Sequence, residues 1–498
     1  MDALAFEHHL TSPQGQGHRP AQGHAGTAGG YACGDEITMT VAVDGDRVSD
    51  AGFTARGCGA STAAASAAVT LVRDASIVDA ARVSTHVVAA ELGGLSPGKL
   101  HAAELAADAL ARALGGAVRA HANIARDPSN PVTLVAMSGG VDSAVAAHLC
   151  AQEGPTLAVT LELWADAEND AERSCCSATA VAQARALAHQ MGIPHVTVDL
   201  REEFRAGVVD PFIAGYAAGE TPNPCVGCNG HVRLDAMLAL ADRLGCDALA
   251  TGHYARTAES DDARGPLLRA AADAAKDQTY MLAALRPESL ARLRFPLGEL
   301  HKPEVRRIAA EAGLPVASKV DSQDLCFLAG TSRARFMERH GAIAGRPGEI
   351  VASDGTTLGR HDGQHRFTVG QRRGLGVAAA EPLFVLDKDA GTGRVTVGPR
   401  DELRTDRVAI RAARLHRDGR RVDRVKLRYR QRPLTARVAG DPGEGRHRSL
   451  SLHLAEPVDG AAPGQLACLM DGDVVVGWGT IDGRAHPESY LNSHAHDV

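Results

Sequence analysis

The sequence predicts a multidomain protein with a small α+β domain, an α/β domain built on a parallel sheet, a small central β-rich domain and a C-terminal β-barrel. Three observations favour this class. The 498 residues exceed what one hydrophobic core usually organises. The middle of the chain alternates short apolar strands with helical stretches, and the last third alternates apolar and polar residues between glycine-rich turns. We place the boundaries at 1–30 for a flexible leading segment, 31–120 for the front domain, 121–130 for a linker, 131–330 for the α/β domain, 331–398 for the central domain, 399–484 for the barrel and 485–498 for a tail.

The front domain begins where a Gly-, His- and Gln-rich segment ends. Residues 37–56, "ITMTVAVDGDRVSDAGFTAR", alternate apolar and polar side chains around an Asp-Gly turn, which predicts a hairpin. Residues 61–75 and 101–114 are alanine-rich and read as helices. The Pro, Asn and Ser of "ARDPSNP" then indicate a linker.

The α/β domain carries four short apolar runs of the buried-strand type: "VTLVAM", "TLAVTLEL", "HVTVDL" and "CDALAT". Helical stretches separate them, so the pattern predicts a parallel sheet covered on both faces. Beyond residue 330, segments such as "PLFVLDKD" and "GRVTVG" predict two β-rich modules that divide near Gly398.

Composition narrows the functional classes. With 44% hydrophobic and 23% charged residues, no apolar run near the roughly 18 residues of a membrane span and no signal pattern, we expect a cytoplasmic protein without a membrane partner. Ten cysteines without framework spacing favour reduced thiols, metal ligands or catalysis over structural disulfides.

The strongest local signal is "SGGVDS", which follows a buried strand and opens a helix. Adjacent glycines let the backbone approach phosphate oxygens, and serine hydroxyls and the helix N-terminus add donors. An aspartate in such a loop suits Mg²⁺. The loop lacks the Gly-Lys-Ser/Thr ending that holds β- and γ-phosphates, so it favours attack at the α-phosphate with pyrophosphate leaving.

"SGGVDS" resembles the signature of the PP-loop ATP pyrophosphatases. Residues 131–481 also resemble the tRNA-specific 2-thiouridylases, through "TPNPCVGCN", "ATGHYAR", "KDQTYML", "DSQDLCF", "GQRRGLG" and "RYRQ". The resemblance implies ATP-dependent adenylation of the 2-oxygen of the wobble uridine in tRNA. Sulfur carried as a cysteine persulfide then replaces that oxygen.

The same resemblance implies the site residues. The nucleophile is Cys228 and the persulfide carrier is Cys326; after sulfur transfer the two can close a disulfide that a reductant reopens. The implied ATP-binding residues are Ala136, Met137, Ser138, Gly139, Gly140, Val141, Asp142, Ser143, Leu161 and Gly252. The implied tRNA-binding residues are Asn223, Pro224, Lys276, Asp277, Gln278, Arg428 and Tyr429, with Asn223, Pro224 and Cys225 against the flipped base.

Cys225 leaves three interpretations open. Some relatives carry aspartate there, so its thiol would serve proton transfer in the persulfide chemistry, which we rank first. Cys225, Cys228 and Cys326 would otherwise hold an iron–sulfur cluster with an open position, in an iron–sulfur-dependent version of the same thiolation. A structural zinc, ranked third, would need Cys175 and Cys176 as further ligands.

Residues 5–114 resemble the NifU/IscU-type iron–sulfur scaffold through "GYACGDEITMTV", "ARGCGASTAAAS" and "GKLHAAELAADAL". The implied iron or zinc ligands are Cys33, Asp35, Cys58 and His101, and Ala102 stands where the family has its third cysteine. A degenerate remnant, a zinc-binding fold and a donor of sulfur or cluster in cis remain open. We favour the donor because tethering raises its effective concentration.

A basic segment predicts the RNA interface. Between Arg407 and Arg437 there are twelve Lys or Arg residues against two acidic ones, in a chain of net charge −7. Alternation in "RVKLRYRQ" places Arg428 and Arg430 on one face of an expected strand, where they would bind phosphates while Tyr429 stacks on a base. We therefore expect tRNA as a partner, and a cysteine desulfurase or sulfur-relay protein as sulfur donor.

Two other classes compete with this reading. Amidotransferase-coupled PP-loop ligases would need neither the paired Cys228 and Cys326 nor a basic barrel. A non-enzymatic iron–sulfur carrier would predict a damaged "SGGVDS" loop, and the loop is intact.

Overall fold

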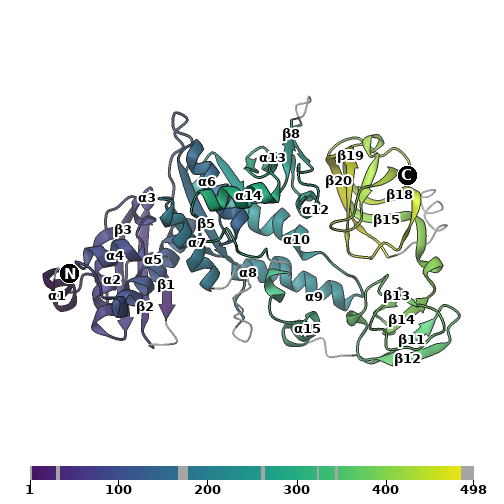
Figure 1. Cartoon of the computed structure of the whole chain (residues 1–498), viewed down its shortest axis with the longest axis horizontal. Coiled ribbons are helices and arrows are strands. Elements are labelled where there is room, and N and C mark those ends of the chain that lie inside the picture. Colours follow the sequence, from purple (N-terminus) through teal and green to yellow (C-terminus); the bar gives the residue numbers. More distant parts are fainter. Residues whose placement is uncertain are drawn as a thin grey trace, which may run out of the picture. The chain divides into compact units, whose positions relative to one another are not determined.

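The computed structural model of the chain describes residues 3–29, 34–166, 178–259, 264–321, 325–341 and 346–483 (Figure 1). The chain divides into two compact units, each described here by itself. Unit 1 comprises Met1–Phe204, Arg233–His253 and Arg292–Gly330. Unit 2 comprises Arg205–Val232, Tyr254–Ala291 and Thr331–Val498.

The front domain in unit 1 is a three-stranded antiparallel sheet covered by helices. Its strands, in spatial order, are β1 (His24–Gly29), β2 (Glu36–Asp44) and β3 (Arg47–Arg56). Its helices are α1 (Ala3–Thr11), α2 (Gly59–Val72), α3 (Ile77–Ala80), α4 (Thr85–Glu91) and α5 (Leu100–His121). The predicted hairpin is confirmed, with Gly45 at φ 60° in its turn.

We expected residues 1–30 to be flexible, but the structure shows regular secondary structure there, in α1 and β1. The buried ring of His9 contacts the Ser66 hydroxyl at 2.9 Å. Gly26 explains why a glycine-rich stretch forms a strand here: a Cβ at this position would lie 2.3 Å from the Ala113 nitrogen. The small residues of β1 therefore let α5 approach the sheet closely.

The α/β sheet of unit 1 is parallel throughout, as predicted, and has the order β10-β7-β4-β5-β6. The strands are β4 (Thr133–Ala136), β5 (Thr156–Glu162), β6 (His195–Asp199), β7 (Ala248–Thr251) and β10 (Leu293–Arg294). The helices around them are α6 (Val141–Glu153), α7 (Ala178–Gln190), α8 (Arg201–Phe204), α11 (Leu234–Arg243) and α14 (Lys302–Glu311). The four predicted strands are all present; β10 is an edge strand too short to leave a sequence signal.

Unit 2 contains the central β-rich domain and a closed barrel. The central sheet has the order β12 (Thr357–His361), β11 (Gly348–Ala352), β14 (Arg394–Gly398) and β13 (Phe384–Asp389). The barrel follows the order β15 (Arg404–Leu415), β18 (Gly445–Asp459), β17 (Leu434–Val438), β16 (Arg424–Lys426), β19 (Leu466–Asp471) and β20 (Val474–Ile481). Pairing of β15 with β20 closes it, which confirms the predicted barrel.

Unit 2 also contains several short helices and strands. They are α9 (Asp210–Ala217), α10 (Pro224–Gly227), β8 (Arg256–Ala258), β9 (Leu267–Arg269), α12 (Thr279–Leu282), α13 (Pro287–Leu290) and α15 (Arg333–Gly341). Of these, α10 carries the predicted site residues Pro224 and Cys225. β9 pairs with β20 and so extends the barrel sheet. Among the described residues, no helix combines the length and the apolar character needed to cross a bilayer.

Candidate active site and nucleic-acid interface

The phosphate loop joins the buried strand β4 to α6 in unit 1. Gly139 has φ 68°, and Gly140 is the N-cap of α6 with no side chain to occupy the helix N-terminus. The Ser143 hydroxyl donates to the Gly140 carbonyl at 3.1 Å and accepts from the Ser138 amide at 3.1 Å. The loop is therefore held in one shape by its own serines, as an anion cradle at a helix start requires.

Gly252 lies against this loop. It follows β7, which is hydrogen-bonded to the side of β4 opposite β5, so the order of the sheet reverses there. Ligands of open α/β sheets bind at such reversal points, beyond the carboxyl ends of the strands. A Cβ on Gly252 would lie 2.7 Å from the Ser143 nitrogen, so only glycine allows this approach. The predicted grouping of Gly252 with the loop in one place is thus observed.

Two lysines that sequence reasoning missed also reach the loop. Lys302 Nζ lies 2.6 Å from Asp142 Oδ1 and 2.9 Å from Asp321 Oδ1, and its side chain is only 10% exposed. Lys319 Nζ donates to the Gly139 carbonyl at 2.9 Å. Asp142, which we expect to bind Mg²⁺, is here paired with an ammonium group. The sequence offered a signal only for Lys319, which lies two residues before "DSQDLCF".

Cys225 and Cys228 lie in a tight helical turn of unit 2. The Asn223 side chain caps α10 by accepting from the Cys225 amide at 3.1 Å, and Pro224 fits the first helical position. A π-helical turn, Cys228–Arg233, follows directly. Cys228 is 7% exposed and Cys225 is partly exposed. The capped turn places the two cysteines at different depths.

Cys326 belongs to unit 1, where it begins a 3₁₀ turn, Cys326–Leu328. The neighbouring Phe327 ring is buried and packs edge-on against the rings of Trp164 and Phe204. This aromatic anchor fixes the backbone beside a partly exposed thiol-bearing residue. Cys175 and Cys176, the suggested further zinc ligands, lie outside the described residues.

Cys150 and Cys246 of the α/β domain and Cys468 of the barrel are packing residues. Cys150, Cys246 and Cys468 are at most 2% exposed. Burial raises the pKa of Cys150 to about 11 and the pKa values of Cys246 and Cys468 to about 12. Their thiols therefore stay protonated at neutral pH and are poor nucleophiles.

Two of the predicted RNA-binding residues of the "KDQ" segment, Asp277 and Gln278, make contacts within unit 2. Asp277 is 6% exposed at its side chain and pairs with Lys426 Nζ at 2.5 Å. Gln278 accepts from the Tyr254 amide at 2.9 Å. Two residues on, the Tyr280 hydroxyl donates to the Leu466 carbonyl of β19 at 2.9 Å. Unit 2 therefore brings the "KDQ" segment and the barrel together.

The basic segment differs from its prediction in two respects. β16 ends at Lys426, so Arg428–Arg430 form a turn and do not share a strand face; Arg430 has φ 63° and its guanidinium lies 5.5 Å from the Tyr429 ring centre. Arg417 and Lys426 are buried, so they do not contribute to a basic surface. Arg428 remains exposed. Alternation failed here because the barrel strand is shorter than the apolar pattern suggests.

A pocket of about 550 Å³ lies beside Arg428 in the barrel domain. Its lining includes Arg400, Asp401, Arg404, Leu427, Arg428 and Gln431. Three arginines against two aspartates, with Asp459 as the second, give the pocket a positive balance. A positive balance of this kind suits an anionic backbone.

The front domain brings together three of its four predicted ligands. One oxygen of Asp35, the Cys58 sulfur and one His101 nitrogen all lie within 4.8 Å of one another. The Ser61 hydroxyl donates to Asp35 at 2.6 Å and, as the main cause, lowers the pKa of that carboxyl. A thiolate, an imidazole and an ionised carboxylate suit iron or zinc. Cys33 lies outside the described residues, and Ala102 is fully buried.

Comparison with known proteins covers nearly the whole chain. Four family models match in succession: the NifU-like N terminal domain at residues 5–120, the tRNA methyl transferase HUP domain at 132–330, the tRNA methyl transferase PRC-barrel domain at 334–399 and the aminomethyltransferase beta-barrel domain at 400–481. The bifunctional protein NifU/MnmA of Rubrobacter xylanophilus is 44% identical over 489 residues, covering 96% of this chain and 97% of that protein. This chain belongs to the bifunctional NifU/MnmA family.

Other relatives of the family match a shorter part of the chain. The tRNA-specific 2-thiouridylase MnmA of Xanthobacter autotrophicus is 42% identical over 374 residues, covering 71% of this chain and 94% of that protein. The protein of the same name from Geobacter metallireducens is 41% identical and covers 70% of this chain and 96% of its own length. The NifU/MnmA family thus joins a nearly complete MnmA-type protein to a further domain.

Proposed function

We propose that this protein is a tRNA-uridine 2-sulfurtransferase that uses ATP to convert the wobble uridine of tRNA into 2-thiouridine. The observation that carries the proposal is the phosphate loop with Gly252 against it, in a chain that matches NifU/MnmA over 96% of its length. Two further lysines, Lys302 and Lys319, reach the same loop and suit a site that handles pyrophosphate. We take the cytoplasm, where its tRNA substrate is found, as the compartment.

In the first proposed step, the uridine 2-oxygen attacks the α-phosphate of ATP. The bond to pyrophosphate breaks, and AMP becomes attached to the 2-oxygen, which makes that oxygen a good leaving group. The Ser138 and Ser143 groups and the α6 N-terminus bind phosphate oxygens. Asp142 is the carboxylate that would hold Mg²⁺, which would neutralise phosphate charge. Lys302 would then shift toward Asp321, its other partner.

In the second step, the outer sulfur of a Cys326 persulfide attacks ring carbon 2 and AMP leaves. The Cys228 thiolate then attacks the inner sulfur of Cys326. This breaks the sulfur–sulfur bond, leaves the outer sulfur on the base and joins Cys228 to Cys326 as a disulfide. A dithiol reductant reopens it by exchange. A cysteine desulfurase or a sulfur-relay protein would reload Cys326.

The test is thiolation of unmodified tRNA by the full-length chain, with 2-thiouridine measured by mass spectrometry after nuclease digestion. Cys228→Ala and Cys326→Ala should each abolish product while ATP–pyrophosphate exchange continues. Cys150→Ala, which changes a cysteine with a pKa of about 11, is the matched control and should retain activity. Product formation by Cys326→Ala would refute the persulfide role.

For the front domain we propose a labile iron or zinc site that supplies sulfur or a cluster to the same chain. The grouping of Asp35, Cys58 and His101 within 4.8 Å supports it. Anaerobic purification followed by iron, zinc and sulfide analysis tests it, with Cys225→Ala beside Cys58→Ala. Loss of iron and sulfide in Cys225→Ala would instead favour a cluster at the thiolation site.

A further inference from the structure

The front domain covers the edge of the catalytic sheet in unit 1. β6 is the outermost strand, and the front domain caps its exposed backbone groups. The His195 amide donates to the Ala81 carbonyl at 2.9 Å, and Arg119 Nη1 donates to the Asp199 carbonyl at 2.9 Å. A Cβ on Gly115 would lie 1.7 Å from the Thr197 oxygen, so the α5 backbone touches the strand. The two domains are therefore packed together and not merely tethered.

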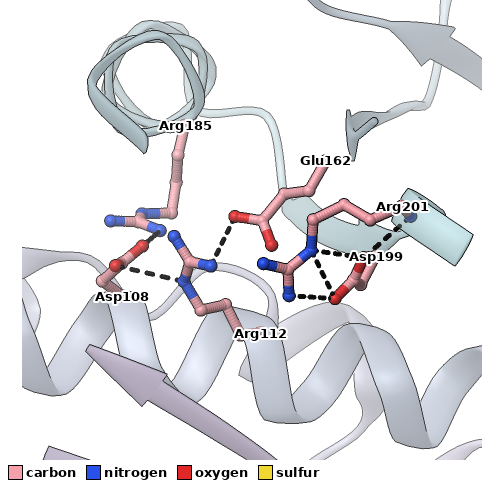
Figure 2. A network of polar contacts seen from close by, with 6 residues as sticks. All are labelled: Asp108, Arg112, Glu162, Arg185, Asp199 and Arg201. Atoms are coloured by element: carbon pink, nitrogen blue, oxygen red, sulfur yellow. Dashed lines mark hydrogen bonds and ion pairs between the residues drawn. The ribbon is translucent and has the colours of Figure 1, made fainter. Parts of the chain in front are cut away.

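A network of ion pairs crosses this boundary (Figure 2). Asp108 and Arg112 extend from α5 toward the catalytic domain. Asp108 Oδ1 pairs with Arg185 Nη1 of α7 at 2.6 Å, and Arg112 Nη1 pairs with Glu162 Oε1 at 2.5 Å. The side chains of Arg185 and Glu162 are only 6% and 8% exposed. Buried ion pairs of this kind are costly to break, because one charge then stays buried without its partner.

Glu162 occupies a particular place on the catalytic sheet. It is the last residue of β5, and β5 pairs in parallel with β4, which leads into the phosphate loop. The preceding residue, Leu161, is the one expected near the adenine. An acidic side chain buried at this point has to be compensated, or the end of the strand will move to bring it to water. The front domain supplies one compensating cation, Arg112, which pairs directly with Glu162, and Arg201 of α8 supplies a second.

We propose that Arg112 is a positioning residue for the nucleotide site, which holds the Glu162 carboxylate and thereby the end of β5 against which the adenine binds. The proposal rests on the ATP site proposed above. Its consequence is specific to this fused chain. The front domain contributes to nucleotide binding through its docking surface, independently of any metal that Asp35, Cys58 and His101 hold.

The charges around Glu162 determine how the loss of nucleotide binding in an Arg112 variant should depend on pH. Burial raises the pKa of Glu162, while Arg112 of α5 and Arg201 of α8 act against that rise. Asp199 of β6 and Asp108 of α5 act in the same direction as burial. Without Arg112, Glu162 is more easily protonated as pH falls, and the neutral acid tolerates burial. An Arg112 variant should therefore bind nucleotide better at pH 6 than at pH 8.5.

The experiment measures binding of α,β-methylene-ATP with Mg²⁺ to the full-length protein by calorimetry at both pH values. Arg112→Met should weaken binding at pH 8.5 by about tenfold or more, with partial recovery at pH 6. Arg112→Lys and Glu162→Gln should stay within about threefold of wild type. The double variant Arg112→Met/Glu162→Gln should also return to that range, because the neutral amide needs no cation. A misfolded protein would not be rescued in this way.

Arg119→Met is the matched control, since Arg119 lies on the same helix and contacts the same edge strand without touching Glu162. Its binding should equal that of wild type. Equal binding by Arg112→Met and wild type at both pH values would overturn the inference. The inference would also be overturned if Arg112→Met and Arg119→Met lost the same nucleotide affinity and Glu162→Gln did not restore it. The loss would then come from weaker packing between the two domains alone. Wild-type protein that binds the analogue but never thiolates tRNA would refute the proposed function while the variants still decide this inference.

Discussion

The proposed nucleotide site and the proposed metal site of the front domain lie in the same unit, but the first is built mainly from backbone and the second from side chains. Backbone amides, a helix start and the approach of Gly252 form the nucleotide site. The proposed metal site would use three side chains from separate segments: Asp35 before β2, Cys58 before α2 and His101 in α5. A site made from backbone tolerates little change in one short segment. A site made from side chains can lose one member, as at Ala102, while the fold persists.

The largest expected effect is that of Gly252→Ala, which tests the backbone-built site. The new Cβ would lie 2.7 Å from the Ser143 nitrogen and push the loop away from its position. A displacement on the scale of 1 Å at a reacting centre costs about 100-fold in rate, so ATP–pyrophosphate exchange should fall by about that factor. Gly154→Ala is the control, because a Cβ there meets nothing within 4 Å. Unchanged exchange in Gly252→Ala would contradict the observed approach.

Next in size is Lys302→Met, which removes a side chain from the otherwise backbone-built site. Asp142 and Asp321 would lose a shared cation in a largely buried position. Breaking a fully buried pair costs on the order of 3 kcal/mol in unfolding free energy, and the loss here should be smaller because Asp142 is partly exposed and Asp321 keeps Arg306. Thermal unfolding should show it, together with weaker ATP–pyrophosphate exchange. Arg307→Met, which breaks an exposed pair with Glu311 in the same helix, should leave the melting temperature unchanged.

The front site should respond to single ligand changes without a change in fold. His101 is 40% exposed at its side chain, so His101→Ala creates no buried cavity. We expect affinity for iron or zinc to fall by about tenfold or more, because mutating even a residue that only hydrogen-bonds to a metal ligand lowers metal affinity by about this factor. Metal analysis and thermal unfolding of the same sample test both parts. Metal content equal to wild type would mean that Asp35, Cys58 and His101 do not form the site.

Sequence reasoning predicted the parallel sheet, the phosphate loop and the barrel, because each depends on a contiguous pattern. It missed Lys302 and Lys319, since their approach to the loop depends on how a segment more than 150 residues away packs against it. It also misjudged the leading segment, where Gly26 permits helix packing that composition alone conceals. Arg428–Arg430 were assigned to a strand that ends at Lys426.

The docking of α5 on β6 left only a weak signal in the sequence. The Gly115-Gly116 pair inside a long helix was the only indication, because glycine costs about 1 kcal/mol relative to alanine in a helix interior. A glycine inside a helix is expected where the helix backbone has to approach another backbone closely, as Gly115 approaches Thr197. Long-range contacts of this kind are specified by shape, and no local pattern reports them.

The smallest expected effect comes from a second histidine, which contrasts with His101. His416 in the barrel is 5% exposed, and its Nε2 has no hydrogen-bond partner among the described residues. Burial, followed by Arg414 and Arg417, lowers its pKa to about 4. In the unfolded chain His416 therefore binds a proton as pH falls through about 6.5, whereas in the folded chain it does so only near pH 4. Unfolding free energy should consequently be highest above pH 6.5 and fall as pH drops toward 4.

His416→Phe should reduce this acid dependence without altering bound metal, whereas His101→Ala should lower bound metal. Urea unfolding of both variants at pH 5 and pH 7.5 separates the two roles. A wild-type stability that does not fall between these pH values would contradict the burial of a neutral His416. Because one histidine is withdrawn from solvent and the other is exposed beside Asp35, only His101 is available to a ligand.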